Sequence, residues 1–110
     1  MPGTKPPKQP RPRPEQIRDL IHRLAVDTRN IVWGGHAHRR MVRRDITDRM
    51  AVEVMRTGLP RGPIDPGRNP GEWEVKMVKE IKGRREVGVV VITIPNQRLF
   101  VKTVEWEDLK

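Results

Sequence analysis

The sequence predicts a small α+β domain in which two to three N-terminal helices pack on a three- to four-stranded antiparallel sheet. Two observations predict this class. In the first half of the chain apolar residues recur at three- and four-residue spacing, as in helices with one buried face, and in the second half they alternate with polar residues, as in strands. A chain of 110 residues has room for one domain. We place it at residues 15–110, after a basic, proline-rich arm at residues 1–14.

The charge and the residue composition indicate which kinds of partner and site this chain can have. The formal net charge is +9 and the chain has no cysteine, so disulfides and thiolate zinc sites are excluded. The basic excess favours an anionic partner, with nucleic acid first, although such a balance also serves solubility alone. No apolar run approaches the roughly 18–20 residues of a membrane span. We therefore expect a cytoplasmic protein that contacts no membrane.

Residues 1–14 contain six prolines, four basic residues and no acid. Such a segment has neither the pattern of a helix nor the apolar residues of a core, so it is predicted to be a disordered arm. Its cations would hold nucleic acid by releasing counterions, or the arm would be an idle terminus.

The first helix is predicted to begin at Pro14, because proline is favoured at the first helical position. Its buried face is given by apolar residues at helical spacing, and His22 falls off that face, so we expect it at the surface. After Asp27 a short extended segment leads to a turn at Gly34 and Gly35. The apolar residues of the helix are Ile17, Leu20, Ile21 and Leu24.

Two further helices follow. The first spans residues 36–44 and should end at Asp45, and the second follows Thr47, a predicted N-cap, and stops at Gly58. The inner face of the second helix is predicted to hold Ala51, Val54 and Met55.

The remaining sequence predicts a loop and then a meander. Residues 59–72 hold four prolines and three glycines, which is typical of a loop. Three strands follow, at residues 73–81, 86–94 and 99–106, joined by tight turns. The continuous apolar run 89–94 indicates a central strand covered on both faces, and Trp73 is assigned to packing.

The segment "GGHAHRRMVRRDIT" at residues 34–47 is the strongest candidate for function. On a helix His36, Arg40 and Arg43 lie in one stripe, beside an apolar stripe of Ala37 and Met41. A half-buried helix with a cationic edge suits phosphate, because guanidinium groups bind phosphate in two-point contacts. The predicted nucleic-acid-binding residues are Arg39, Arg40, Arg43, Arg44, Arg84 and Arg85.

The string His36-Ala37-x-x-Arg40-Met41-x-x-Arg44-x-Ile46-Thr47 resembles the signature of a bacterial family of unknown function, which reads roughly HAxxRMxxRxI(S/T). The order of elements over about residues 30–106 looks like that of the RelE, BrnT and MqsR toxins. This resemblance implies a RelE-like fold, a metal-independent endoribonuclease acting on RNA, and an antitoxin protein or the ribosome as partner. MqsR-like toxins carry a glutamine where this chain has Glu74, after Trp73. They also carry a tyrosine on the next strand, whereas this chain contains no tyrosine.

Metal-free RNA cleavage needs a base, an acid and cations that stabilise the phosphorane. His36 could serve as base or acid and Arg40 could bind the phosphate, while Lys76 and Lys102 could contribute from the sheet. A purely structural alternative is that His36 caps the helix and that Arg40 or Arg44 pairs with an acid on the sheet. His36 and His38 are two positions apart and point in different directions on a helix, so we predict no metal site and no cofactor.

Two rival interpretations of the function stay open. A non-enzymatic regulatory module would bind nucleic acid or a protein partner through the same arginines, and a decayed toxin fold would be retained for assembly. Alanine at His36 separates catalysis from binding, because it should abolish cleavage and leave binding nearly intact.

Overall fold

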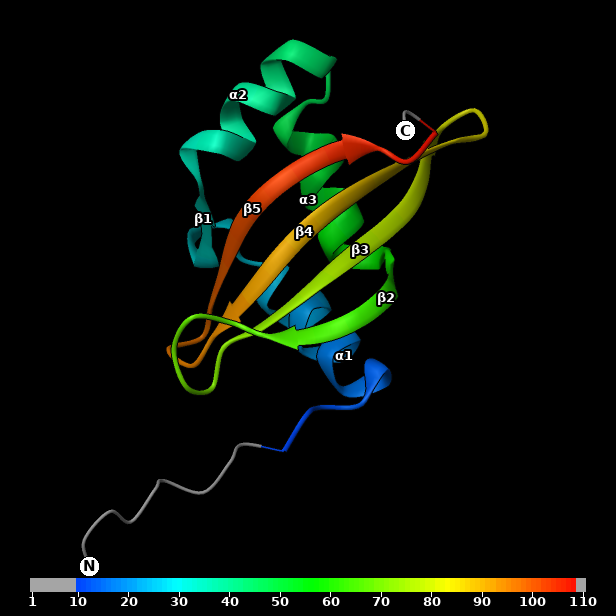
Figure 1. Ribbon diagram of the computed structural model, residues 1–110. Helices are drawn as coiled ribbons and strands as arrows, with labels where there is room; N and C mark the ends of the chain where they lie inside the picture. The colour runs from blue at the N-terminus through cyan, green and yellow to red at the C-terminus, as the bar shows by residue number, and fades with distance from the viewer. Residues whose placement is uncertain (1–9, 109–110) are drawn as a thin grey trace, which may run out of the picture.

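The computed structural model describes residues 10–108, which form one five-stranded sheet with three helices on one face (Figure 1). Residues 1–9, most of the predicted arm, lie outside the described residues. In chain order the elements are α1 (Pro14–Ala25), the 3-10 turn η1 (Thr28–Asn30), β1 (Ile31–Trp33), α2 (Gly35–Arg44), α3 (Asp48–Thr57), β2 (Leu59–Pro66), β3 (Trp73–Lys82), β4 (Arg85–Ile94) and β5 (Arg98–Trp106).

The strand order is β1-β5-β4-β3-β2. The predicted α+β class is confirmed, but the expected antiparallel sheet of three to four strands is wrong in two respects. The sheet has five strands, and β1 pairs with β5 in parallel, with Ile31 opposite Leu99. A parallel pair needs a long connection, and here the chain passes through α2, α3 and three strands before β5 returns beside β1. The RelE-like assignment stays a prediction.

Strand β2 is formed by residues that the sequence predicted to be a loop. Residues 59–66 form β2, which pairs with β3 at the edge of the sheet. Proline is tolerated on an edge strand, where its missing N–H faces away from the neighbouring strand. The pairing slips between Arg61 and Asp65, and Gly62 has a φ of 81° there. The prolines and glycines therefore predicted a loop where the structure has an irregular edge strand of eight residues.

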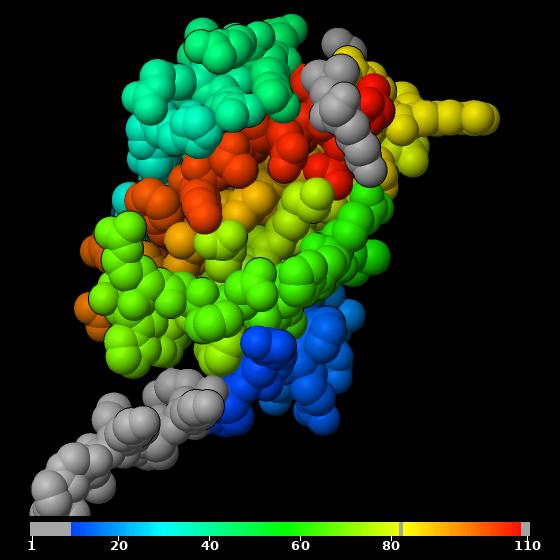
Figure 2. Space-filling view, viewed as in Figure 1, coloured from blue at the N-terminus to red at the C-terminus, as the bar shows by residue number. Residues whose placement is uncertain are grey.

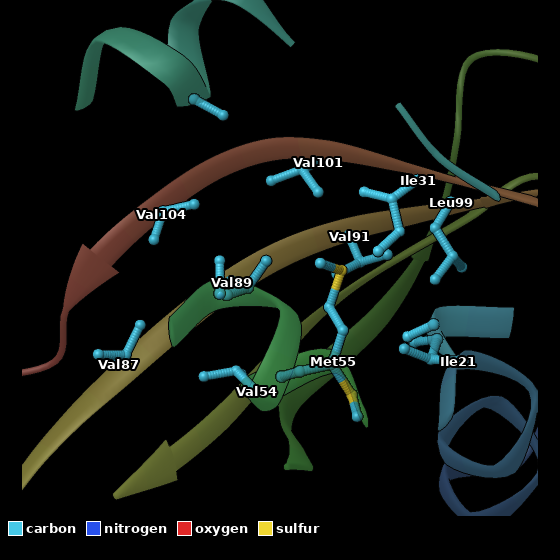
Figure 3. Close-up of a cluster of buried hydrophobic side chains, with 14 of the residues drawn as sticks. Ile21, Ile31, Val54, Met55, Val87, Val89, Val91, Leu99, Val101 and Val104 are labelled. Carbon is cyan, nitrogen blue, oxygen red and sulfur yellow. The ribbon is translucent and has the colours of Figure 1, made fainter. Parts of the chain in front are cut away.

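The core is a single apolar layer between the helices and one face of the sheet (Figure 3). Val54 and Met55 of α3 face the inner side chains of β4, among them Val89 and Val91. Each such side chain stabilises the fold by about 1.5–3 kcal/mol when it leaves water. The prediction that residues 89–94 are covered on both faces was wrong, because Ile92, on the helix-free side, is only half-buried.

The predicted helix boundaries are confirmed. Pro14 begins α1, and Asp45 ends α2 in the left-handed conformation with a φ of 56°. The Thr47 hydroxyl accepts a hydrogen bond from the backbone N–H of Met50, at 3.1 Å, and so caps α3. Ala51, Val54 and Met55 are fully buried, as predicted.

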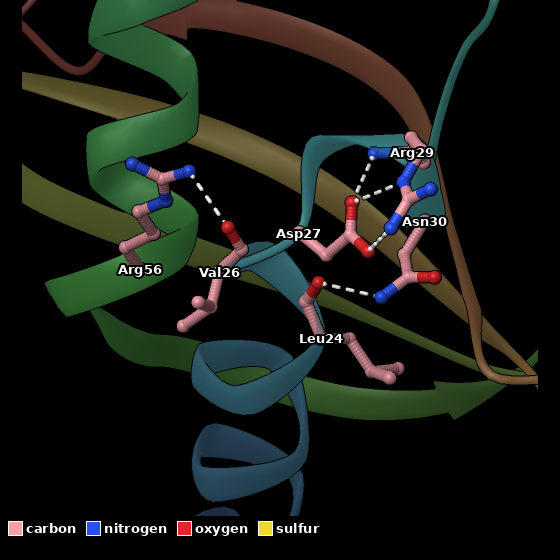
Figure 4. Close-up of polar contacts among 6 residues, drawn as sticks. All are labelled: Leu24, Val26, Asp27, Arg29, Asn30 and Arg56. Carbon is pink, nitrogen blue, oxygen red and sulfur yellow. Dashed lines mark hydrogen bonds and ion pairs between the residues drawn. The ribbon is translucent and has the colours of Figure 1, made fainter.

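Side chains satisfy the last carbonyls of α1 (Figure 4). The guanidinium of Arg56, in the last turn of α3, donates to the carbonyls of Ala25 and Val26 at 2.8 and 3.0 Å. The Asn30 amide donates to the carbonyl of Leu24 at 3.0 Å. The two Arg56 bonds fix α1 against α3, and all three bonds satisfy carbonyls at the end of α1 that have no partner within the helix.

His22 is not the surface residue that the sequence indicated. It is half-buried, and its Nε2 lies 2.7 Å from the carbonyl oxygen of Gly58. Gly58 is buried where α3 turns into β2, so this contact also joins α1 to the end of α3.

We predict that Gly58→Ala lowers the free energy of unfolding by about 1–3 kcal/mol. The added methyl would clash with the carbonyl oxygen of Val54 and lie 2.9 Å from that of Val78, and neither backbone group can yield cheaply. Urea unfolding measures the change. Gly35→Ala is the matched control, since its methyl would meet no atom closer than 3.6 Å. Equal stability of the two variants would contradict the packing described here.

Candidate nucleic-acid interface

Helix α2 lies against β5 at one end of the molecule, and its apolar stripe is confirmed. Ala37 is fully buried and Met41 nearly so. The helix begins directly on the strand, because the N–H of Gly34 donates to the carbonyl of Val101 at 3.0 Å. A β-carbon at Gly34 would lie 2.8 Å from that carbonyl oxygen, so glycine permits the close approach.

The C-terminal end of α2 is held by a buried tryptophan. The indole N–H of Trp106 on β5 donates to the carbonyl of Arg44 at 2.8 Å. The N–H of Ile46 donates to the carbonyl of Met41 at 3.0 Å and closes the last turn. Both ends of α2 are therefore fixed, and its outward residues stand on a rigid support.

The exposed side of α2 carries arginines beside His36, His38 and Val42. Four arginines of α2 form no ion pair and no side-chain hydrogen bond with any residue from 10 to 108. The structural alternative considered above, pairing of Arg40 or Arg44 with an acid of the sheet, is not what these contacts show. His36 is exposed, and the N-cap of α2 is Gly34, without a side-chain cap. We call Arg39, Arg40, Arg43 and Arg44 the α2 arginine cluster.

The two predicted arginines outside α2 lie at the β3–β4 turn. Arg84 is exposed. The guanidinium carbon of Arg85 lies 4.0 Å from the centre of the Trp106 ring, and its Nε lies 3.4 Å from Asp108. Because Trp106 also bonds to Arg44, this turn neighbours the C-terminal end of α2. The structure thus brings the six predicted arginines to one end of the molecule, with Arg85 partly neutralised.

The predicted catalytic lysines lie elsewhere. Figure 2 shows the face of the sheet that no helix covers, where side chains of β2 to β5 are open to solvent. Lys76 and Lys102 belong to this open sheet face, and each is paired with a carboxylate. Lys76 lies 2.7 Å from Glu107, and Lys102 lies 3.1 Å from Glu74.

No hydrogen bond or ion pair among the described residues joins His36 or Arg40 to either lysine. Two of the four predicted catalytic residues therefore lie on α2, and the other two take part in the ion pairs of the sheet. A lysine held by a carboxylate is less available to stabilise a phosphorane, because the partner already neutralises its charge.

A small ionic network organises the open sheet face. Arg61 on β2 donates two hydrogen bonds to Glu86 on β4, at 3.0 and 2.8 Å, and lies 3.7 Å from Glu107. These hydrogen bonds lower the pKa of the Glu86 carboxyl below its usual value. Gly88 leaves room for the Glu107 side chain over β4, since a β-carbon at position 88 would clash with the Glu107 carboxylate. The Glu107 side chain is only 10% exposed, although it lies close to the end of the described chain.

Neither a metal centre nor a membrane span is found in the part of the chain that the structure describes. No three metal-ligating side chains cluster among residues 10–108. None of the described helices is long and apolar enough to cross a membrane.

We predict that Arg61→Gln raises the pKa of Glu86 toward the usual glutamate value of about 4.3. A lowered pKa in the folded state stabilises the fold above the unfolded-state pKa, and that stabilisation is lost as the pH falls through the folded-state pKa. The variant should therefore lose this acid-dependent contribution. Carboxyl-carbon NMR titration measures it, with Arg29→Gln as control, because Arg29 pairs with Asp27 instead. An unchanged Glu86 titration in Arg61→Gln would contradict the assignment.

Comparison with protein-family models, curated proteins and solved structures finds no match to this chain. The resemblance of residues 36–47 to the signature of a bacterial family of unknown function stays a prediction. The likeness in element order to the RelE, BrnT and MqsR toxins, and the antitoxin or ribosome that it implies as partner, stay predictions as well. The function proposed next rests on the geometry of α2.

Proposed function

We propose that this protein binds RNA through the α2 arginine cluster. The observation that carries the proposal is the absence of carboxylate partners for these four guanidiniums among the described residues, while Arg61, Lys76 and Lys102 all have them. Free guanidiniums on a helix with fixed ends are available for phosphate, and because their backbone positions are already set, only side-chain freedom is lost on binding. RNA is named rather than DNA because of the resemblance to ribonuclease toxins.

The shape of the surface also supports contact with the phosphate backbone. Trp33, Trp73 and Trp106 all pack against or within the core, so they do not form an exposed row of aromatic rings on which successive bases could stack. The exposed His38 and Val42 show that the cationic surface is narrow and that other residue types flank it. We therefore expect binding dominated by phosphate contacts and strongly dependent on salt.

Cleavage of the bound RNA is the second candidate function. His36 favours it, because this exposed imidazole lies one turn before Arg40 and is a group that can accept or donate a proton. Binding has the stronger support, because Lys76 and Lys102 are engaged by Glu107 and Glu74.

Replacing Arg39, Arg40 and Arg43 together by glutamine should weaken binding of a labelled single-stranded RNA roughly tenfold, since exposed ion pairs contribute about 0.2–1 kcal/mol each. The slope of log affinity against log salt should fall by up to about 2, or about 0.7 for each lost phosphate contact. Fluorescence anisotropy over a salt series measures both quantities.

The matched control is Arg29→Gln, which removes an exposed arginine that is already paired with Asp27. It should leave affinity and slope nearly unchanged. A triple variant that binds like the wild type would refute the role of α2. Equal affinity for duplex DNA of the same sequence would refute the choice of RNA.

We expect RNA to be recovered intact after incubation with the protein in EDTA, because the strand lysines are neutralised by carboxylates. Mapping of new 5′ ends in total cellular RNA tests this expectation, with His36→Ala beside the wild type. His38→Ala is the matched control, since His38 is also exposed on α2 but lies off the stripe of His36 and Arg40. Discrete cuts that vanish in His36→Ala and persist in His38→Ala would establish a metal-independent ribonuclease instead.

A further inference from the structure

An apolar groove of about 570 Å³ lies at the end of the molecule opposite α2. Its walls come from α1, from the start of β3 and from the turn that follows β4, and the extended residues 10–13 form its rim. The volume falls within the roughly 300–1,000 Å³ of binding pockets. We call this feature the Trp73 groove.

The walls of the Trp73 groove carry large apolar side chains that the fold leaves incompletely covered. Leu20, Trp73 and Ile94 are each only half-buried, although Ile17 beside them is 1% exposed. Exposed apolar surface gathered in a concavity, rather than scattered, is typical of an interaction site. An occupant must therefore present apolar side chains.

The charge of the groove is one-sided. None of its lining residues is acidic, while Arg11 and Arg13 stand on its rim. Arg13 shares its charge with the neighbouring Glu15 at 3.3 Å, but Arg11 forms no ion pair with any described residue. Arg23 lies just outside and donates to the Gln97 amide oxygen at 3.2 Å. An occupant must therefore carry negative charge beside its apolar residues.

We propose that the Trp73 groove is a docking site for an acidic amphipathic peptide segment of a partner protein. Such a segment supplies leucine-like side chains for Leu20, Trp73 and Ile94, and carboxylates for Arg11 at the rim. A nucleic acid has the charge but lacks the aliphatic surface, so it fits the α2 arginine cluster better than this groove. The proposal is independent of RNA binding, because it concerns the opposite end of the fold.

A labelled peptide with leucine and glutamate at amphipathic helical spacing is the probe for the groove. Two peptides control it, one with glutamine in place of glutamate and one with the same composition in scrambled order. Anisotropy with the full chain should show tightest binding of the amphipathic acidic peptide. Equal binding of the scrambled peptide would overturn the proposal, because attraction to the +9 chain would then suffice.

Two pairs of variants test the contacts. Arg11→Glu should weaken binding of the acidic peptide about tenfold, or about 1.4 kcal/mol, and should leave binding of the glutamine peptide unchanged. The control Arg49→Glu, which replaces an exposed arginine on α3, should change the binding of neither peptide. Leu20→Ala should weaken both peptides, and Val26→Ala, which truncates a 69% exposed side chain of the same helix region, should weaken neither. Thermal melting verifies that each variant folds.

NMR shift mapping locates the occupant. The peptide should shift the signals of residues 16–24, the Trp73 indole and residues 93–97, and leave α2 unchanged. Shifts centred on α2 would overturn the proposal. Anionic lipid vesicles or RNA that displace the peptide and shift the same signals would overturn the choice of a peptide as occupant.

Discussion

Burial of only one face of the sheet is the constraint on which the rest of the structure depends. Val87, Val89 and Val91 of β4 are fully buried beneath the helices, so each helix must bring its apolar stripe to this same side. A short helix with two buried residues, Ala37 and Met41, meets this requirement at the margin of the sheet. Four of its remaining residues are arginines, of which Arg39 and Arg43 are exposed and Arg40 and Arg44 are half-buried.

The open sheet face and the exposed side of α2 differ in whether their charged side chains are paired. On the open sheet face, cations and acids alternate across strands and neutralise one another, as in the contact of Lys76 with Glu107. On α2, Arg39 and Arg43 stand one turn apart, as do Arg40 and Arg44, and like charges at this spacing destabilise a helix. A bound polyanion would relieve this repulsion. The fold therefore holds a cationic helix that an anionic partner would stabilise.

The helices and three of the strands could be predicted from the sequence because their signals are local. Pro14, Thr47 and Gly58 mark helix ends through backbone geometry that neighbouring residues decide. The partners of Lys76 and Lys102 could not be predicted, because they depend on register across strands, including the shift near Val90 between β4 and β5. Edge strand β2 was not predicted for another reason. Its prolines are tolerated in a strand only because β2 lies at the edge of the sheet, and the sequence does not show that position.

The same separation of local and non-local signals explains why the predicted arginines of α2 lie together in the structure. It also explains why the four predicted catalytic residues do not, since two of them lie on α2 and two on the sheet. A helix displays residues of one short segment together, so residues 36–44 needed no tertiary information to form one cationic surface. A catalytic centre needs groups from distant segments within hydrogen-bond reach, and here the sheet commits its lysines to its own carboxylates. The proposed phosphate binding would require only cationic groups held close together, and the residues of one helix, α2, supply them.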